Sequence, residues 1–137
     1  MRNFVVCCIG LLLVLPGCGG TSLPATVSVS GIVTFNGEPL ADATVVFYPA
    51  EGKPATGKTG PDGVYKLTTF QADDGALPGK HKVAISKSSA APESNSPEDM
   101  AKIKREIPDK YSNADTSGLT ADVQVGQTAD IDFNLAD

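Results

Sequence analysis

The sequence predicts an all-β protein, an antiparallel sandwich of six or seven short strands in one domain. Short runs rich in Val, Ile, Thr, Phe and Tyr alternate with clusters of Gly, Pro, Asn and Asp, which is typical of strands joined by turns. Strands do not alternate with long amphipathic helices, so the pattern excludes a parallel α/β sheet. With 137 residues, of which 41% are hydrophobic, the chain has room for one core.

The first predicted unit is a β-hairpin with strands at residues 27–35 and 43–48. Asn36 and Gly37 lie between these strands, and both tolerate the positive φ of a tight turn. Pro39 has no N–H group to donate, so we expect it outside the ladder. Alternate residues of both runs are apolar, which gives the pair one face that the rest of the chain must cover.

We predict further strands at residues 64–70, 80–87, 121–125 and 129–135. The last two flank Gly126 and are expected to form a second hairpin. Residues 51–63 are rich in Gly, Pro and Lys and are predicted as loop and turn. The alternation of apolar and polar residues identifies the side chains that face the core: Tyr65, Leu67, Val83, Ile85, Ile131, Phe133 and Leu135.

The connection at residues 88–117 is unusually long for a compact domain, and such connections are often functional or disordered. We predict a short helix that begins at Pro97 and ends before Pro108. A binding role for this connection predicts that Ile107, Pro108 and Tyr111 contact a partner. The alternative, which we favour for Tyr111, is that its ring packs the connection back onto the sandwich.

Residues 1–17 have the features of a signal peptide. An unbroken apolar run spans residues 4–15, and it is too short to cross a bilayer, which needs about 20 residues. Leu15, Gly17 and Cys18 then resemble the bacterial lipobox. In that motif a small residue precedes the cysteine whose thiol receives the lipid.

The resemblance to a lipobox implies cleavage before Cys18, a lipidated tether at residues 18–25 and a folded domain at residues 26–137. Two or three acyl chains anchor a protein stably, so a membrane is the expected partner. Gly19 stands where an aspartate often marks inner-membrane retention, which favours the periplasmic face of the outer membrane within the cell envelope. The alternative is an ordinary secretory signal with an incidental cysteine.

The cysteine content of the mature chain excludes an internal disulfide, and its charge disfavours nucleic acid as a partner. Cys7 and Cys8 lie within the apolar run and leave with the signal, so the mature chain has one cysteine and no internal disulfide. Once Arg2 is removed, ten of the 11 basic residues remain against 16 acidic ones. Nucleic acid requires a basic surface, so this balance argues against it as a partner.

No group of residues suited to catalysis or metal binding is visible in the sequence. The single histidine, His81, lies between two lysines and is expected at the surface, whereas nucleophilic catalysis needs a base beside its nucleophile. Asp73 and Asp74 lie in a turn, and Asp130 and Asp132 lie on the solvated face of a strand. We therefore predict no enzyme activity, no cofactor and no metal site.

A set of short motifs follows in order along the mature chain: Val29-Ser30-Gly31-Ile32-Val33, Asn36-Gly37-Glu38-Pro39-Leu40, Ala43-Thr44-Val45-Val46-Phe47, Asp62-Gly63-Val64-Tyr65 and Pro78-Gly79-Lys80-His81-Lys82-Val83. Together they resemble a carboxypeptidase regulatory-like domain, and with the lipobox they resemble small bacterial lipoproteins that carry one such domain. The resemblance implies a transthyretin-like (prealbumin-like) sandwich of seven strands. It also implies a non-catalytic module.

We therefore expect a monomeric, lipid-anchored module of the cell envelope that binds a protein or a wall glycan. Two other functions stay open. A small transthyretin-related hydrolase shares the implied fold, but it relies on several histidines and a characteristic C-terminal tetrapeptide, whereas this chain has one histidine and ends at Asp137. A carbohydrate-binding module needs exposed aromatic rings, for which Tyr48 and Tyr111 are the candidates.

Overall fold

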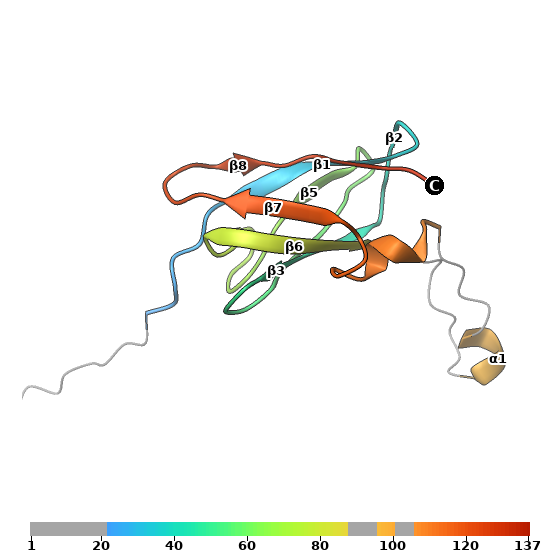
Figure 1. Ribbon diagram of the computed structural model, residues 1–137, viewed down its shortest axis with the longest axis horizontal. Coiled ribbons are helices and arrows are strands. Elements are labelled where there is room, and N and C mark those ends of the chain that lie inside the picture. The colour runs from blue at the N-terminus through green and yellow to red at the C-terminus, as the bar shows by residue number, and fades with distance from the viewer. Residues whose placement is uncertain (1–21, 88–95, 101–105) are drawn as a thin grey trace, which may run out of the picture.

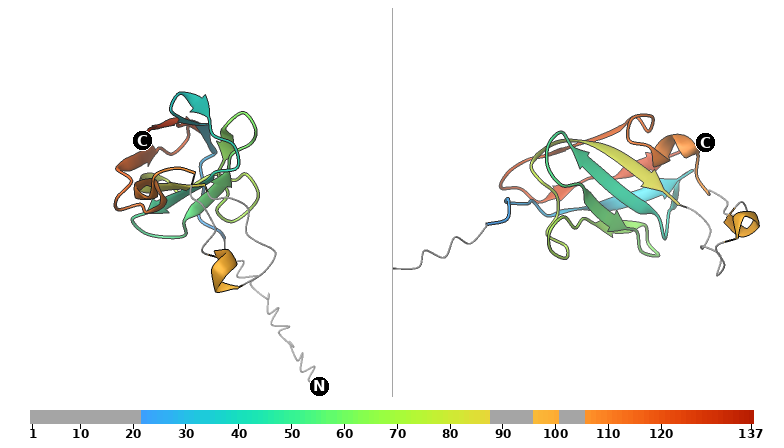
Figure 2. Two further views of the ribbon diagram at one scale, coloured as in Figure 1. Left: turned by 90° about the vertical axis from the view of Figure 1, so that its right-hand side faces the viewer. Right: turned by 90° about the horizontal axis from the view of Figure 1, so that it is seen from below.

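Two β-sheets pack face to face in the computed structural model of the chain, which describes residues 22–87, 96–100 and 106–137 (Figures 1 and 2). The predicted all-β sandwich is confirmed. Buried and exposed residues alternate along the longer strands, so each sheet turns its apolar side toward the other. The predicted signal peptide and Cys18 lie outside the described residues.

Strand β1 (Val29–Phe35) is the centre of the first sheet. It pairs antiparallel with β2 (Glu38–Pro39) and β5 (Val64–Lys66), and parallel with β8 (Ala129–Asp130) and β9 (Phe133–Leu135). The parallel pairs correct the expectation of a wholly antiparallel sandwich. Gly31 permits the close packing here, because a Cβ atom on it would collide with the carbonyl oxygen of Ile131.

The second sheet is antiparallel throughout, in the order β4-β3-β6-β7. Its strands are β4 (Ala55–Lys58), β3 (Thr44–Pro49), β6 (Gly79–Ser86) and β7 (Leu119–Val123). Figure 1 shows β6 and β7 side by side. Strand β4 lies in residues predicted as loop and turn. It escaped prediction because Ala55 is its one buried residue, so it lacks an apolar alternation.

The predicted hairpin between residues 27–35 and 43–48 is wrong, because β1 and β3 belong to different sheets. Asn36 and Gly37 do form the tight turn, with φ values of 51° and 86°, but this turn joins β1 to the short β2. Pro39, expected outside the ladder, lies within β2 at the edge of the sheet, where a proline is tolerated. The apolar faces of β1 and β3 therefore meet across the core.

The second predicted hairpin, between residues 121–125 and 129–135, is also wrong. Strand β7 pairs with β6 in the second sheet, whereas β8 and β9 pair with β1 in the first. The turn at Gly126, where φ is 82°, therefore carries the chain from one sheet to the other. The alternation of side chains shows which face of a strand is apolar, but it does not show which strand lies beside it.

One hydrophobic core fills the space between the sheets. Of the residues predicted to face it, Tyr65, Leu67, Val83 and Ile85 are at most 1% exposed, Phe133 and Leu135 are buried, and Ile131 is half-buried. Phe47 contributes a central ring, whose centroid lies 5.9 Å from that of Phe133 and 6.3 Å from that of Tyr65. Aromatic contacts of this kind add to the stability that burial provides.

Backbone hydrogen bonds join the two sheets where β4 meets the chain just after β5, and we call this the backbone-closed edge. The N–H of Thr56 donates to the carbonyl of Thr68 at 2.9 Å, and the reverse bond measures 2.8 Å. Gly57 follows Thr56, and a Cβ atom on it would collide with the carbonyl oxygen of Lys66. The missing side chain of Gly57 therefore allows the two sheets to approach.

Residues 106–117 close a second opening, beside β6 and the C-terminal end of β9, and we call it the tyrosine-closed edge. The 3₁₀-helix η1 (Asp109–Ser112) presents the Tyr111 ring, which is 8% exposed. The Tyr111 hydroxyl donates to the carbonyl of Ala136 at 2.9 Å and accepts the N–H of the same residue at 3.2 Å. The interpretation that Tyr111 packs the connection onto the sandwich is confirmed.

The predicted helix begins where we expected it, since α1 (Pro97–Met100) starts at Pro97. Residues 101–105 lie outside the described part of the chain. The helix η1 follows Pro108 and was not predicted. Figure 1 shows α1 at the end of the molecule opposite residues 22–26, from which the N-terminal tether leaves.

Candidate functional site

The single histidine is buried, which corrects its expected place at the surface. His81 is 2% exposed, and its ring centroid lies 5.6 Å from that of Phe47. The reason is its position in β6, where it shares the inward parity of Val83 and Ile85. The imidazole Nε2 lies 2.7 Å from the carbonyl oxygen of Leu77, so Nε2 carries the proton.

Burial of His81 removes the one residue that could act as a histidine base on a substrate. Its Nδ1 atom is enclosed and has no hydrogen-bond partner among the described residues. The enclosed Nδ1 cannot reach a substrate proton, whereas a general base must reach the proton that it removes. The geometry therefore gives His81 a role in packing.

Asp74, one of the acidic residues weighed as a cation ligand, binds its own turn. Its carboxylate accepts the backbone N–H groups of Thr69 at 2.7 Å and of Phe70 and Gln71 at 2.9 Å. Burial acts to raise the pKa of Asp74, but the backbone bonds outweigh it, and the pKa lies below its ordinary value. Within the described residues no three His, Cys, Asp or Glu side chains form a group that could hold a metal ion.

Tyr65 also has a structural role rather than a free hydroxyl group. Its hydroxyl donates to the carbonyl of Ile131 at 2.5 Å, at the interruption between β8 and β9. Burial, followed by the nearby carboxylates of Asp132 and Asp130, raises the pKa of Tyr65 well above its usual range. The phenol therefore stays protonated near neutral pH and serves as a fixed donor.

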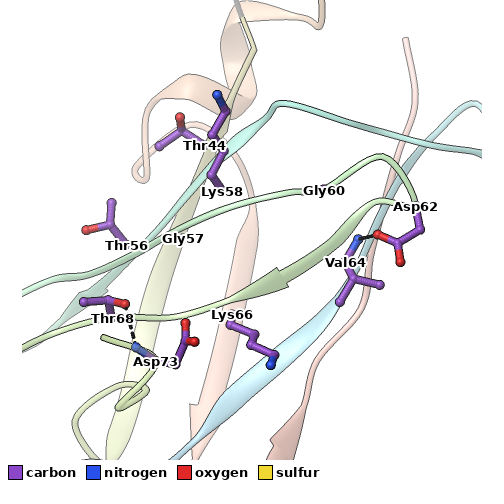
Figure 3. Close-up of a pocket in the computed structure, with 10 residues that line it drawn as sticks. All are labelled: Thr44, Thr56, Gly57, Lys58, Gly60, Asp62, Val64, Lys66, Thr68 and Asp73. Atoms are coloured by element: carbon purple, nitrogen blue, oxygen red, sulfur yellow. Dashed lines mark hydrogen bonds between the residues drawn. The ribbon is translucent and has the colours of Figure 1, made fainter. Parts of the chain in front are cut away.

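A polar groove of about 770 Å³ runs along the backbone-closed edge (Figure 3). Several of its polar groups already bind the protein itself. The Thr68 hydroxyl accepts the N–H of Asp73 at 3.0 Å, and the Asp62 carboxylate accepts the N–H of Val64 at 3.2 Å. Lys58, on the rim, lies 3.5 Å from a carboxylate oxygen of Asp42. Part of the polar lining of the groove is therefore already used in bonds within the protein.

A second hollow, of about 670 Å³, lies on the outer face of the second sheet, and we call it the Tyr48 hollow. Two rows of cross-strand neighbours border it: Tyr48, Lys82 and Thr120 in one row, and Lys80 with Asp122 in the other. All five residues are exposed. Because directly opposed side chains on one sheet face lie about 5 Å apart, the five form one continuous surface.

Among the described residues, Tyr48 is the aromatic residue that is exposed to solvent. It is 42% exposed, whereas Tyr65 is 1% and Tyr111 8% exposed. Lys82 is held beside it, because its ammonium lies 2.7 Å from the carboxylate of Asp115, and that hydrogen bond holds the pKa of Asp115 below its usual value. The aliphatic stem of Lys82 therefore forms a wall of the hollow beside the ring.

The Tyr48 hollow lies at the end of the sandwich from which the tether leaves. An adjoining depression is lined by Pro24 and Ala25 of the tether and shares three residues with the hollow, Pro49, Ala50 and Lys80. Residues 106–117, by contrast, close the opening beside the C-terminal end of β9. The most open aromatic surface is thus not on the long connection.

The residues proposed from sequence as partner contacts have other places in the fold. Ile107 and Tyr111 are buried, 5% and 8% exposed, and Pro108 is half-buried. Ile107 and Tyr111 pack into the core where they close its edge, so we do not retain the three residues as contact residues. Lys80, with Asp122 opposite it, was missed, because cross-strand register decides which polar residues gather around Tyr48.

Within the described residues no helix has the length and apolar composition needed to span a membrane. Comparison of the chain with protein-family models, with curated proteins and with solved structures found no match.

Proposed function

We propose that the chain is a non-catalytic β-sandwich module, of the carboxypeptidase regulatory-like type, which a lipid on Cys18 anchors in a bacterial cell envelope. The observation that carries this proposal is the place of Cys18. It follows the apolar run at residues 4–15 and precedes Val27, the first residue of the core. The thiol of Cys18 accepts the lipid, and the acyl chains hold the mature chain at the membrane.

The spacing between anchor and core supports this arrangement. Eight residues lie between Cys18 and Val27, and a segment of that length spans about 30 Å when extended. Gly, Thr and Ser dominate its first part, a composition that makes a flexible linker. The sandwich is thereby kept close to the bilayer surface while it stays free to turn.

The buried histidine supports the non-catalytic part of the proposal. A transthyretin-related hydrolase would need accessible imidazole groups, and His81 is enclosed between β3, β7 and the Leu77 loop. Its Nε2 proton is already donated to a carbonyl oxygen. We therefore propose a binding or structural module. From the sequence we further propose that it acts as a monomer on the periplasmic face of the outer membrane, as Gly19 after Cys18 suggests.

Mass spectrometry of the full chain expressed in a bacterial host tests the anchor. We expect the mature N-terminal peptide to begin at Cys18 and to carry diacylglyceryl and acyl groups, and the protein to sediment with membranes. Cys18→Ser abolishes the modification and releases the protein, whereas Cys8→Ser, within the signal, leaves both unchanged. A mature chain that begins elsewhere, or a Cys18 without lipid in wild type, would overturn the proposal.

A further inference from the structure

We propose that the Tyr48 hollow binds a neutral saccharide, with one sugar ring stacked on Tyr48. The inference rests on the proposed function, since it names the ligand of an envelope-binding module. It places the site at the tethered end of the sandwich, on β3, β6 and β7. Three features of the hollow carry it: one open aromatic ring, a mixed set of polar groups, and a balance of charge.

The ring supplies the apolar part of the contact. Tyr48 lies on the outer face of β3 and is 42% exposed, so part of its side chain is accessible to a ligand. A pyranose presents C–H groups on its faces, and stacking these on an aromatic ring removes apolar surface of both partners from water. The Lys82 stem, held in place by Asp115, lies beside the ring and limits where the sugar can sit.

The polar groups suit hydroxyls, which both donate and accept hydrogen bonds. Lys80 offers a donor, Asp122 directly opposite offers an acceptor, and Thr120 offers both. No described carboxylate lies within ion-pair distance of Lys80. These groups project from the same sheet face as the ring, so a sugar stacked on Tyr48 turns its hydroxyls toward them.

Charge selects a neutral ligand over an ionic one. Around the hollow the two lysines are matched by two aspartates, Asp115 and Asp122. A polyanion would meet these carboxylates and an already acidic protein, and a polycation would meet the lysines. The groove along the backbone-closed edge is a weaker candidate, because Thr68 and Asp62 already bind backbone N–H groups there.

The three tyrosines of the chain allow a direct test. The full chain is labelled with 3-fluorotyrosine, held in micelles of a detergent without a sugar headgroup, and followed by ¹⁹F NMR. The probes are cellohexaose, chitohexaose and maltohexaose, with polygalacturonate as the acidic comparison. We expect at least one neutral probe to shift the Tyr48 resonance in a saturable way and to leave those of the buried Tyr65 and Tyr111 in place. Tyr48→Phe identifies the resonance by removing it.

Variants in the hollow sharpen the test. Tyr48→Ala should weaken binding by about tenfold or more, and Lys80→Gln or Asp122→Asn by about threefold each, as measured by calorimetry. Ile32→Ala, an exposed position on the first sheet, is the matched control and should bind like wild type. The Tyr48, Lys80 and Asp122 side chains are exposed, so these variants should keep the wild-type fold.

Two results would overturn the inference. One is a Tyr48 resonance that no neutral probe moves at concentrations up to about 10 mM. The other is binding of polygalacturonate alone that survives Tyr48→Ala and is lost in Lys80→Gln, because that would show an anion site. Lipidation of Cys18 is measured separately by mass spectrometry. The proposed lipid anchor and the proposed saccharide site are therefore tested independently.

Discussion

At the backbone-closed edge the two sheets meet through hydrogen bonds between Thr56 and Thr68, whereas at the tyrosine-closed edge the Tyr111 ring fills the opening. The first closure depends on an absent side chain, because any Cβ atom on Gly57 would strike the opposite backbone. The second depends on a large side chain that carries a hydroxyl. Adding a side chain at Gly57 should therefore destabilise the backbone-closed edge, whereas truncating Tyr111 should destabilise the tyrosine-closed edge.

The largest effect is expected at the tyrosine-closed edge. Tyr111→Ala removes a buried ring and leaves a cavity beside β6, which should lower the free energy of unfolding by about 4 kcal/mol. Chemical denaturation followed by circular dichroism measures the change. Tyr111→Phe keeps the ring and loses the hydrogen bonds to Ala136, so it should cost about 1 kcal/mol. Equal losses in both variants would contradict the account of Tyr111 as a space-filling closure.

An intermediate effect is expected at the backbone-closed edge. Gly57→Ala adds one methyl group against the Lys66 carbonyl, and the forced separation of the strands should cost about 2 kcal/mol. Gly60→Ala, on the same edge, is the control, since its Cβ would lie 3.3 Å from the Asp62 carboxylate, a side chain that can move. Thermal unfolding compares the two, and a Gly57→Ala variant as stable as wild type would show that the edge closes without the glycine.

A smaller effect than at Gly57, and one that depends on pH, is expected next to the backbone-closed edge at Asp74. Its carboxylate holds the backbone that follows Thr68, and its pKa in the folded protein lies below the ordinary value. A depressed pKa stabilises the fold above the unfolded value of about 3.9, and this stabilisation disappears as the pH falls through the folded pKa.

Asp74→Asn should therefore lower the free energy of unfolding by about 1.5 kcal/mol at neutral pH and by much less at pH values below the folded pKa. Denaturation series at several pH values give the two curves, which should converge on acidification. Parallel curves would show that the carboxylate charge does not stabilise this turn. Asp73→Asn is the matched control, because the contact of Asp73 with Thr68 uses its backbone N–H and not its carboxylate.

Local features of the fold were predictable from the sequence. The turn at Asn36 and Gly37 follows from the conformations that these two residues tolerate. The inward side chains of β5 and β6, such as Leu67 and Ile85, follow from alternation along each strand. Alternation also placed His81 on the inward side, but its neighbouring lysines were given more weight, and the surface assignment was wrong for that reason.

The candidate site was predictable only in part. Tyr48 was recognised as an aromatic residue that a ligand could use, and it is exposed. Tyr111 was named with it, and only the fold distinguishes them, because the long connection folds back and buries one ring while the outer face of β3 leaves the other open. Lys80 and Thr120 join Tyr48 through the registers of β3, β6 and β7.

The sequence by itself therefore determined the secondary structure class, the turn at Asn36 and most of the core, because each depends on residues that are near neighbours in the chain. Only the tertiary structure decided which strands pair, why position 57 requires a glycine and which tyrosine is exposed to solvent. The physical reason is that strands in both sheets have one apolar face. The alternation of a strand is therefore compatible with a given second strand either beside it in the same sheet or opposite it across the core. Contacts distant in sequence, such as those of β1 with β9, select between these arrangements.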